Sequence, residues 1–136
     1  MVGVDGSPPS LAALHWAARQ AELTGCHLDV VTTWDWPSSA GWPVPVPDDF
    51  DPEANVQSGL EAAVASVRTA HPGVTLETKV IEGHPAPILV GESKGADLLV
   101  VGSRGHGAFV GMLLGSVSEY CATHAHCPVV VHRPPT

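Results

Sequence analysis

Short apolar segments alternate with segments of helical periodicity along this chain, and no other feature restricts its fold as strongly. The expected strands are residues 2–4, 28–34, 74–82, 97–101 and 128–132, and the expected helices are residues 8–24, 53–70, 85–94 and 116–125. Strands that alternate with helices form an open, mostly parallel sheet that helices cover on both faces. We therefore predict an α/β fold with one five-stranded sheet.

Individual residues mark some of the expected boundaries. Ser7 followed by Pro8 is typical of a helix start, and Gly25 stands where a left-handed residue would end that helix. Residues 74–82 alternate between apolar and polar side chains, which favours an edge strand. Residues 97–101 are almost wholly apolar, which is typical of a strand buried on both faces.

Residues 35–52 interrupt this alternation. The segment reads DWPSSAGWPVPVPDDFDP, and its five prolines predict a long Trp/Pro-rich loop without a regular ladder of backbone hydrogen bonds. Trp34, Trp36 and Trp42 would either line a ligand pocket or partner surface, or pin this loop by aromatic packing.

Length and charge narrow the class of protein. The chain of 136 residues fits a single domain, 1–136, and no stretch reaches the roughly 20 apolar residues that cross a bilayer. Fourteen acidic residues against six basic ones give a formal charge of −8, so we expect neither nucleic acid nor a membrane as partner. The first residues do not resemble a signal peptide and the three cysteines form no CxxC pair, so we expect reduced thiols and a cytoplasmic location.

The segment VVGSRGHGAFVGMLLGSVS, residues 100–118, leads from a strand into a helix and carries five glycines. Such loops let backbone amides approach an anion, and the dipole of the following helix favours negative charge. The spacing is G-x2-G-x9-G-S, which is neither the Walker nor the dinucleotide-binding pattern; Gly107 and Gly111 match no position of it. On its own the segment leaves two roles open for Ser116: phosphate binding, or a capping box in Ser-Val-Ser-Glu.

Together these segments resemble the universal stress protein family. The matching segments are VDGS at 4–7, GADLLVVGSRG at 95–105, GSVS at 115–118 and HCPVVV at 126–131. The resemblance covers nearly the whole chain and implies a Rossmann-like, adenine nucleotide alpha hydrolase-like sheet with strand order 3-2-1-4-5. It also implies the ATP-binding branch of the family, which carries G-x2-G-x9-G-[S/T]. The first strand is shorter than the family's usual central strand, which leaves open whether native residues precede Met1.

The resemblance implies an ATP site across the ends of the first and fourth strands, and leaves ADP and AMP open as the bound nucleotide. Asp5 would contact the nucleoside, unless it only forms an Asx turn, and the backbone near Thr33 would meet the adenine edge, unless Thr33 is an ordinary strand residue. The loop around the ribose and phosphates would be Gly102, Ser103, Arg104 and Gly105, and the amides and hydroxyl for the phosphates would come from Gly115, Ser116 and Val117. A side chain at Gly115 would then occupy the phosphate's space.

The charge of ATP predicts a bound metal ion, and the motifs of the sequence predict little catalysis. Arg104 is the only cation of the glycine-rich loop, so we expect Mg²⁺ to accompany the nucleotide, with Ser116 as a candidate ligand. Because no Walker lysine or kinase-type motif is present, we expect at most slow hydrolysis. The resemblance implies a nucleotide-dependent regulatory or stress-survival factor. The alternatives are an ATPase or phosphotransfer enzyme, and a nucleotide-independent interaction module.

Two further features concern partners and metals. The resemblance implies a homodimer in which the last strand, Pro128 to His132, pairs across a two-fold axis and so avoids an exposed edge. The segment CATHAHC, Cys121 to Cys127, contains good soft-metal ligands but also fits ordinary packing and helix capping.

Overall fold

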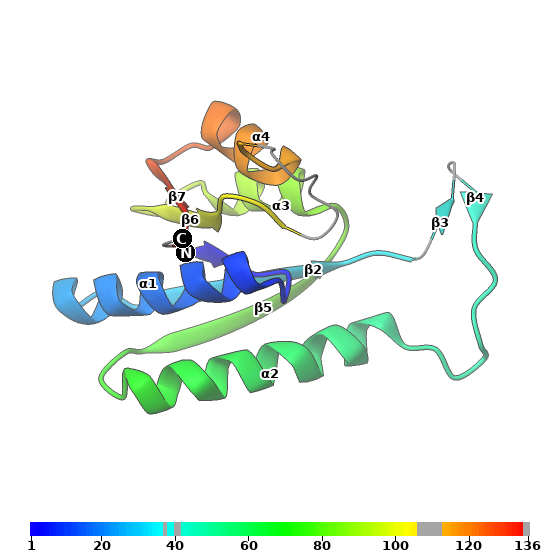
Figure 1. The fold of residues 1–136 in the computed structure, drawn as a ribbon, viewed down its shortest axis with the longest axis horizontal. Coiled ribbons are helices and arrows are strands. Elements are labelled where there is room, and N and C mark those ends of the chain that lie inside the picture. The colour runs from blue at the N-terminus through cyan, green and yellow to red at the C-terminus, as the bar shows by residue number, and fades with distance from the viewer. Residues whose placement is uncertain (37, 40–41, 106–112, 135–136) are drawn as a thin grey trace.

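A computed structural model describes residues 1–36, 38–39, 42–105 and 113–134 (Figure 1). The main sheet contains five parallel strands: β1 (Val2–Gly3), β2 (Leu28–Trp34), β5 (Leu76–Glu82), β6 (Leu99–Gly102) and β7 (Val129–His132). Their order across the sheet is β5-β2-β1-β6-β7. Numbered along the chain, this order is 3-2-1-4-5, so the predicted α/β arrangement and the edge position of the third strand are confirmed.

Helices cover both faces of the sheet. They are α1 (Pro8–Thr24), α2 (Pro52–Ala70), α3 (Pro85–Glu92) and α4 (Ser116–His124). The α1 and α2 face is filled by a core that includes Leu14, Val30 and Val64, and the α3 and α4 face by one that includes Leu89 and Cys121. Figure 1 shows the two pairs of helices on opposite sides of the sheet. The fold therefore has three layers, helices–sheet–helices, and the ends of the strands are left uncovered by these helices.

The boundaries of α1 follow the local signals in the sequence. The Ser7 side chain accepts a hydrogen bond from Ser10 N, and two prolines open the helix. Gly25 ends it with φ 73°, in the left-handed region where a side chain would be strained. These contacts confirm the predicted cap residues.

The segment after β2 contains a short antiparallel hairpin, β3 (Ser38–Ser39) with β4 (Trp42–Pro43). The prediction that residues 35–52 hold no ladder is therefore wrong for these two pairs. A ladder of this length needs few N–H donors, and Pro43 stands at its end, where a missing donor costs little. The last residues of the segment belong to α2, since Asp51 caps that helix and Pro52 begins it.

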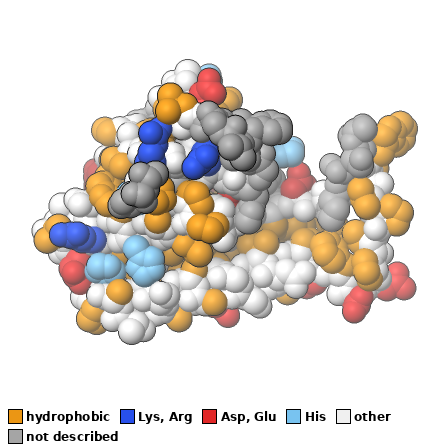
Figure 2. All heavy atoms as spheres, viewed as in Figure 1, with side chains coloured by type: hydrophobic (Ala, Val, Ile, Leu, Met, Phe, Trp, Pro, Cys, Tyr) orange, Lys and Arg blue, Asp and Glu red, His pale blue; other side chains and the backbone are white. Residues whose placement is uncertain are grey.

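Hydrophobic side chains gather on the segment between β2 and α2, which extends away from the sheet (Figures 1 and 2). Trp42 is 76% exposed. Trp36 packs edge-on against Trp34, with ring centroids 5.6 Å apart, and it also contacts Phe50. For Trp36 the contacts therefore favour a loop pinned by aromatic packing.

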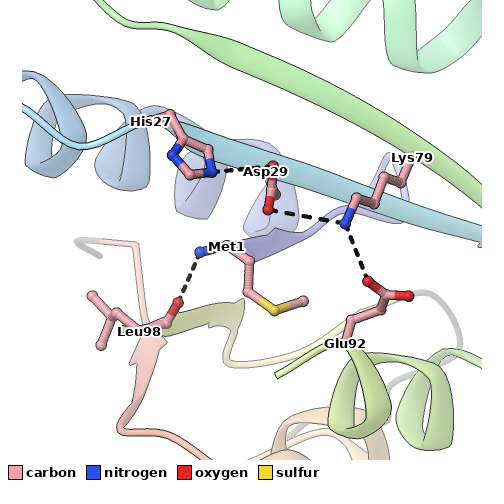
Figure 3. Close-up of polar contacts among 6 residues, drawn as sticks. All are labelled: Met1, His27, Asp29, Lys79, Glu92 and Leu98. Atoms are coloured by element: carbon pink, nitrogen blue, oxygen red, sulfur yellow. Dashed lines mark hydrogen bonds and ion pairs between the residues drawn. The ribbon is translucent and has the colours of Figure 1, made fainter. Parts of the chain in front are cut away.

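A charged cluster joins β2, β5 and α3 on the α3 side of the sheet (Figure 3). Lys79 Nζ lies 3.3 Å from Glu92 Oε2 and 4.0 Å from Asp29 Oδ2. The hydrogen bond to Glu92 raises the pKa of Lys79. Because Lys79 is 42% exposed, water screens the cluster, and we expect it to stabilise the fold only modestly.

The structure also bears on two expectations from the sequence, namely metal binding by the segment Cys121–Cys127 and the absence of a membrane partner. All three cysteines are free thiols, and Cys121 is fully buried in the core between α4 and the sheet. Within the described part of the chain, no group of three or more His, Cys, Asp or Glu residues is placed to hold a metal. None of the described helices is both long and apolar enough to cross a bilayer.

Candidate functional site

A cleft of about 560 Å³ opens beyond the carboxyl ends of β1, β2 and β6. The strand order reverses between β1 and β6, and in open α/β sheets this switch point is where ligands bind. Every predicted site residue except Ser103 lines the cleft. The structure thus brings together residues from the first turn, from β2 and from both ends of the glycine-rich loop.

The backbone of Thr33 faces the cleft because of the register of the parallel ladder. The backbone N–H and C=O groups of even-numbered β2 residues face β5. For example, Trp34 O accepts a hydrogen bond from Gly83 N at 2.7 Å, just after β5. Odd-numbered residues face β1, where Val31 O accepts from Val4 N at 2.9 Å. The next odd-numbered residue of β2 is Thr33, and β1 ends before it could pair with this residue. The N–H and C=O of Thr33 therefore point into the cleft.

Asp5 forms the Asx turn that was one of its two predicted roles, and it also lines the cleft. Its Oδ1 accepts a hydrogen bond from Ser7 N at 2.9 Å, which is an Asx turn. Its Oδ2 faces the loop after β6, where a Cβ added to Gly105 would lie only 2.5 Å away. Glycine at position 105 therefore lets the loop pass directly over the Asp5 carboxylate.

The start of α4 provides unpaired backbone donors at one end of the cleft. Glu119 N is the first amide to bond back along the helix, to Gly115 O at 3.0 Å. The amides of Ser116, Val117 and Ser118 therefore have no intrahelical acceptor. The N-cap is Gly115, with no side-chain cap hydrogen bond, so the capping-box alternative for Ser116 is wrong and its exposed hydroxyl lies at the cleft.

Ser103 supports the site rather than lining it. This residue is buried, its N–H donates to His132 O at 2.8 Å, and its C=O accepts from Gly115 N at 2.7 Å. The hydroxyl of Ser118 also donates to Ser103 O, at 2.9 Å. Ser103 thus positions the start of α4, and its predicted contact with a ligand stays a prediction. The Gly115 amide is already used within the protein.

Gly102 and Gly115 are needed for packing of the chain against itself. A Cβ at Gly102 would lie 3.0 Å from the carbonyl of Pro9, because the start of α1 crosses directly over the end of β6. A Cβ at Gly115 would lie 3.2 Å from the Cα of Arg104. A side chain at Gly115 would therefore crowd the Arg104 backbone, and because Gly115 also lines the cleft, the expectation that it would occupy a phosphate's space stays a prediction.

Apart from Trp34, which was a candidate pocket residue, sequence reasoning missed the opposite end of the cleft. Its wall there is formed by Trp34, Asp35, Gly83, His84 and Pro85, from the ends of β2 and β5. His84 Nε2 lies 3.6 Å from Asp35 Oδ2, with both side chains substantially exposed. The signal was available, because Gly-His-Pro follows a predicted strand and so belongs to the same carboxyl edge.

The two helix starts at the cleft differ in their capacity to bind an anion. The start of α3 has proline at positions 85 and 87, which carry no N–H, and the Asp35 carboxylate lies beside it. The start of α4 has three amides without an intrahelical acceptor, and Arg104 lines the cleft near it. Anions are therefore favoured at the α4 end and disfavoured at the α3 end. Gly107 and Gly111 lie outside the described residues.

Comparison with known proteins gives this geometry a family. The model of the universal stress protein family matches residues 1–133. The chain belongs to the universal stress protein family. A universal stress protein from Mycobacterium tuberculosis (strain H37Rv) is 38% identical over 139 residues, which cover 96% of this chain and 46% of that protein. This chain thus spans about half the length of the curated relatives it matches.

Solved structures of the family share the fold. A universal stress protein crystallised in complex with cAMP is 30% identical, with a TM-score of 0.71 over 96% of this chain and 91% of that one. The UspA protein from Lactobacillus plantarum has a TM-score of 0.73 at 22% identity, covering 97% and 96% of the two chains. The second likeness is one of fold alone.

Proposed function

We propose that this chain binds an adenine nucleotide, ATP with Mg²⁺, and acts as a nucleotide-dependent regulatory or stress-survival factor without efficient catalysis. The observation that carries the proposal is the polarity of the cleft. One end offers the free amides of α4 together with Arg104, and the other offers Trp34 and the backbone of Thr33. A phosphate would accept hydrogen bonds at the first end, and a base would pack and pair at the second.

The size of the cleft and one relative support a nucleotide as the ligand. A volume of about 560 Å³ lies within the range of small-molecule pockets. The exposed N–H and C=O of Thr33 match the acceptor and donor that adenine presents side by side on its Watson–Crick edge. The relative that is 30% identical was crystallised with cAMP, an adenine nucleotide.

Charge balance favours a divalent cation with ATP. Among the described residues that line the cleft, Arg104 is the one lysine or arginine, and the whole chain carries a formal charge of −8. A triphosphate would bring several more negative charges, which Mg²⁺ bound between phosphate oxygens would offset. The Ser116 hydroxyl lines the cleft at the start of α4 and is the candidate protein ligand of such an ion.

Binding without efficient turnover fits the groups at the α4 end. Phosphoryl transfer needs a group that orients the nucleophile as well as charge stabilisation. Of the described residues there, Asp5 is the one carboxylate, and its Oδ1 is already held by the Ser7 amide. We therefore assign the cleft to recognition, with the nucleotide as a regulatory ligand.

Thermal melting with and without nucleotide tests the proposal. ATP with Mg²⁺ at millimolar concentration should raise the melting temperature, since a ligand at about 100 times its Kd stabilises by about 2.7 kcal/mol. ADP, AMP and cAMP in parallel identify the preferred nucleotide. Arg104→Ala should reduce the shift with ATP, whereas Arg19→Ala, an exposed arginine on α1 outside the cleft, should not.

Two outcomes would decide against parts of the proposal. If no adenine nucleotide raises the melting temperature, the chain is a nucleotide-independent module and the proposal fails. If ATP binds and phosphate is released with many turnovers per minute, the regulatory assignment fails and the protein is an ATPase.

We further propose a homodimer through β7. This strand is the last in the sheet order, and its ladder with β6 uses the backbone groups of its even-numbered residues. The N–H and C=O of Val129 and Val131 therefore point to the open edge, where a second β7 would pair with them. Sedimentation equilibrium should give a dimer, and Val131→Pro should weaken it; a monomer at micromolar concentration would contradict the pairing.

A further inference from the structure

Asp35 and His84 lie together at the α3 end of the cleft, where a phosphate is disfavoured. Asp35 directly follows β2, and His84 is the N-cap residue of α3. The two side chains come within 3.6 Å, and both residues line the cleft. The register of β2 with β5 brings the two loops together, through the bond from Gly83 N to Trp34 O.

The local structure holds the Asp35 carboxylate in a defined orientation. Its Oδ1 accepts a hydrogen bond from Trp36 N at 2.9 Å, and its Oδ2 faces His84. The imidazole makes no cap hydrogen bond to α3, although it stands at the position where a cap would form. The side chains of His84 and Asp35 are 79% and 47% exposed, so an ion pair here contributes little to folding. A role toward a ligand explains the arrangement better than a role in stability.

We propose that Asp35, oriented by His84, is a specificity-determining residue that selects a 6-amino purine over a 6-oxo purine. This inference rests on the proposed function, because it assumes that a purine nucleotide lies in the cleft. The exocyclic amine of adenine has two hydrogens, and the C=O of Thr33 can accept one of them. A carboxylate at the mouth of the cleft accepts the second.

A 6-oxo purine would meet the opposite chemistry at the same place. Hypoxanthine and guanine carry an oxygen where adenine carries the amine, and this oxygen would face both the Thr33 carbonyl and the Asp35 carboxylate without a donor. Acceptor atoms that face one another repel and form no hydrogen bond, so a site built from acceptors disfavours a ligand that presents another acceptor. Asp35 adds a full negative charge to this rejection.

Comparing AMP with IMP isolates the effect, because the two nucleotides share the same ribose and phosphate. We expect the wild-type chain to bind AMP more tightly than IMP, with the Kd ratio measured by calorimetry. Asp35→Asn replaces one acceptor oxygen by an amide that can donate, and should reduce this ratio about tenfold. The matched control Asp48→Asn changes an exposed carboxylate of the same segment that does not line the cleft, and should leave the ratio unchanged.

His84 is tested as a positioning residue. His84→Ala should reduce the ratio to a value between those of the wild type and Asp35→Asn, and His84→Gln, which retains a donor toward Asp35, should restore part of it. If AMP binds but Asp35→Asn leaves the ratio unchanged, this inference is overturned and the proposed function stands. If neither AMP nor IMP binds the wild type, both are overturned. Unchanged melting temperatures of the variants without nucleotide would show that each remains folded.

Discussion

The N–H of Gly115 donates to the carbonyl oxygen of Ser103 across 2.7 Å, which joins the two ends of the glycine-rich loop. The same carbonyl accepts the Ser118 hydroxyl, so one oxygen fixes the start of α4 against the end of β6. The backbone of Arg104 and the free amides of α4 are therefore held in place before any ligand binds. Preorganised donors of this kind lose little entropy when an anion arrives.

Gly115→Val should destabilise this junction. The new side chain would meet the Cα of Arg104, which lies 3.2 Å from a Cβ at this position. Overpacking of this kind costs about 1–3 kcal/mol in the free energy of unfolding, and nucleotide affinity should fall with it. Guanidinium unfolding gives the first quantity. As a control, Gly59→Ala places a methyl group in open space on α2 and should stabilise by about 0.5–1 kcal/mol. Equal midpoints for Gly115→Val and the wild type would contradict the contact.

Ser118→Ala and Ser116→Ala should separate stability from binding. The buried Ser118 hydroxyl donates within the loop junction, so its loss should cost about 1 kcal/mol in the free energy of unfolding. The exposed Ser116 hydroxyl makes no cap bond, so its loss should leave the free energy of unfolding unchanged and weaken the binding of ATP with Mg²⁺. Unfolding curves and calorimetry of the two variants provide the comparison, and the reverse pattern would refute the two assignments.

Gly102→Ala should loosen the contact between α1 and β6. A Cβ at this position would lie 3.0 Å from Pro9 C and O, which are backbone atoms that a rotamer change cannot move. We expect a loss of about 1–3 kcal/mol in the free energy of unfolding. Gly91→Ala is the matched control, since nothing lies within 4 Å of the added Cβ. A Gly102→Ala variant as stable as the wild type would mean that α1 shifts freely on the sheet.

Cys121 should make the protein less stable at alkaline pH. Burial raises the pKa of its thiol from 9.0 to about 11, so the folded state keeps a proton that the unfolded chain loses. The stabilisation is complete below about pH 9 and is lost as the pH rises toward 11. Unfolding midpoints measured across this range should fall for the wild type and for Cys26→Ser, which changes an exposed thiol. Cys121→Ala should be less stable at neutral pH and have a shallower pH dependence; an unchanged slope would exclude Cys121 as its source.

Much of the fold could be predicted because its signals are local. The bounds of α1 and β2 agree with the sequence to the residue, since Ser7, Pro8 and Gly25 mark the helix ends directly. Strand starts were less accurate. The third strand of the sheet begins at Leu76 rather than at residue 74, because its first partner is Leu28 on β2. Pairing with a distant segment sets such a boundary, and a local pattern does not contain it.

The candidate site divides in the same way. The spacing of the glycines located the α4 end of the cleft, and the resemblance added Asp5 and Thr33. Asp35 and His84 were missed, because they are 49 positions apart in the sequence and meet only through the register of β2 with β5. The hairpin at β3 and β4 was missed because a proline-rich composition does not exclude a ladder of two pairs.

By itself, then, the sequence determined which segments form the helices and the strands of the main sheet, and where the glycine-rich loop lies, because periodicity, caps and glycine spacing act over a few residues. Only the tertiary structure decided why glycine stands at positions 102 and 115. Gly102 makes room for Pro9 and Gly115 for Arg104, and those neighbours are atoms of other segments. A side chain is excluded at such a position by the atoms that pack against the backbone there. Those atoms reach their places only when the tertiary structure has formed.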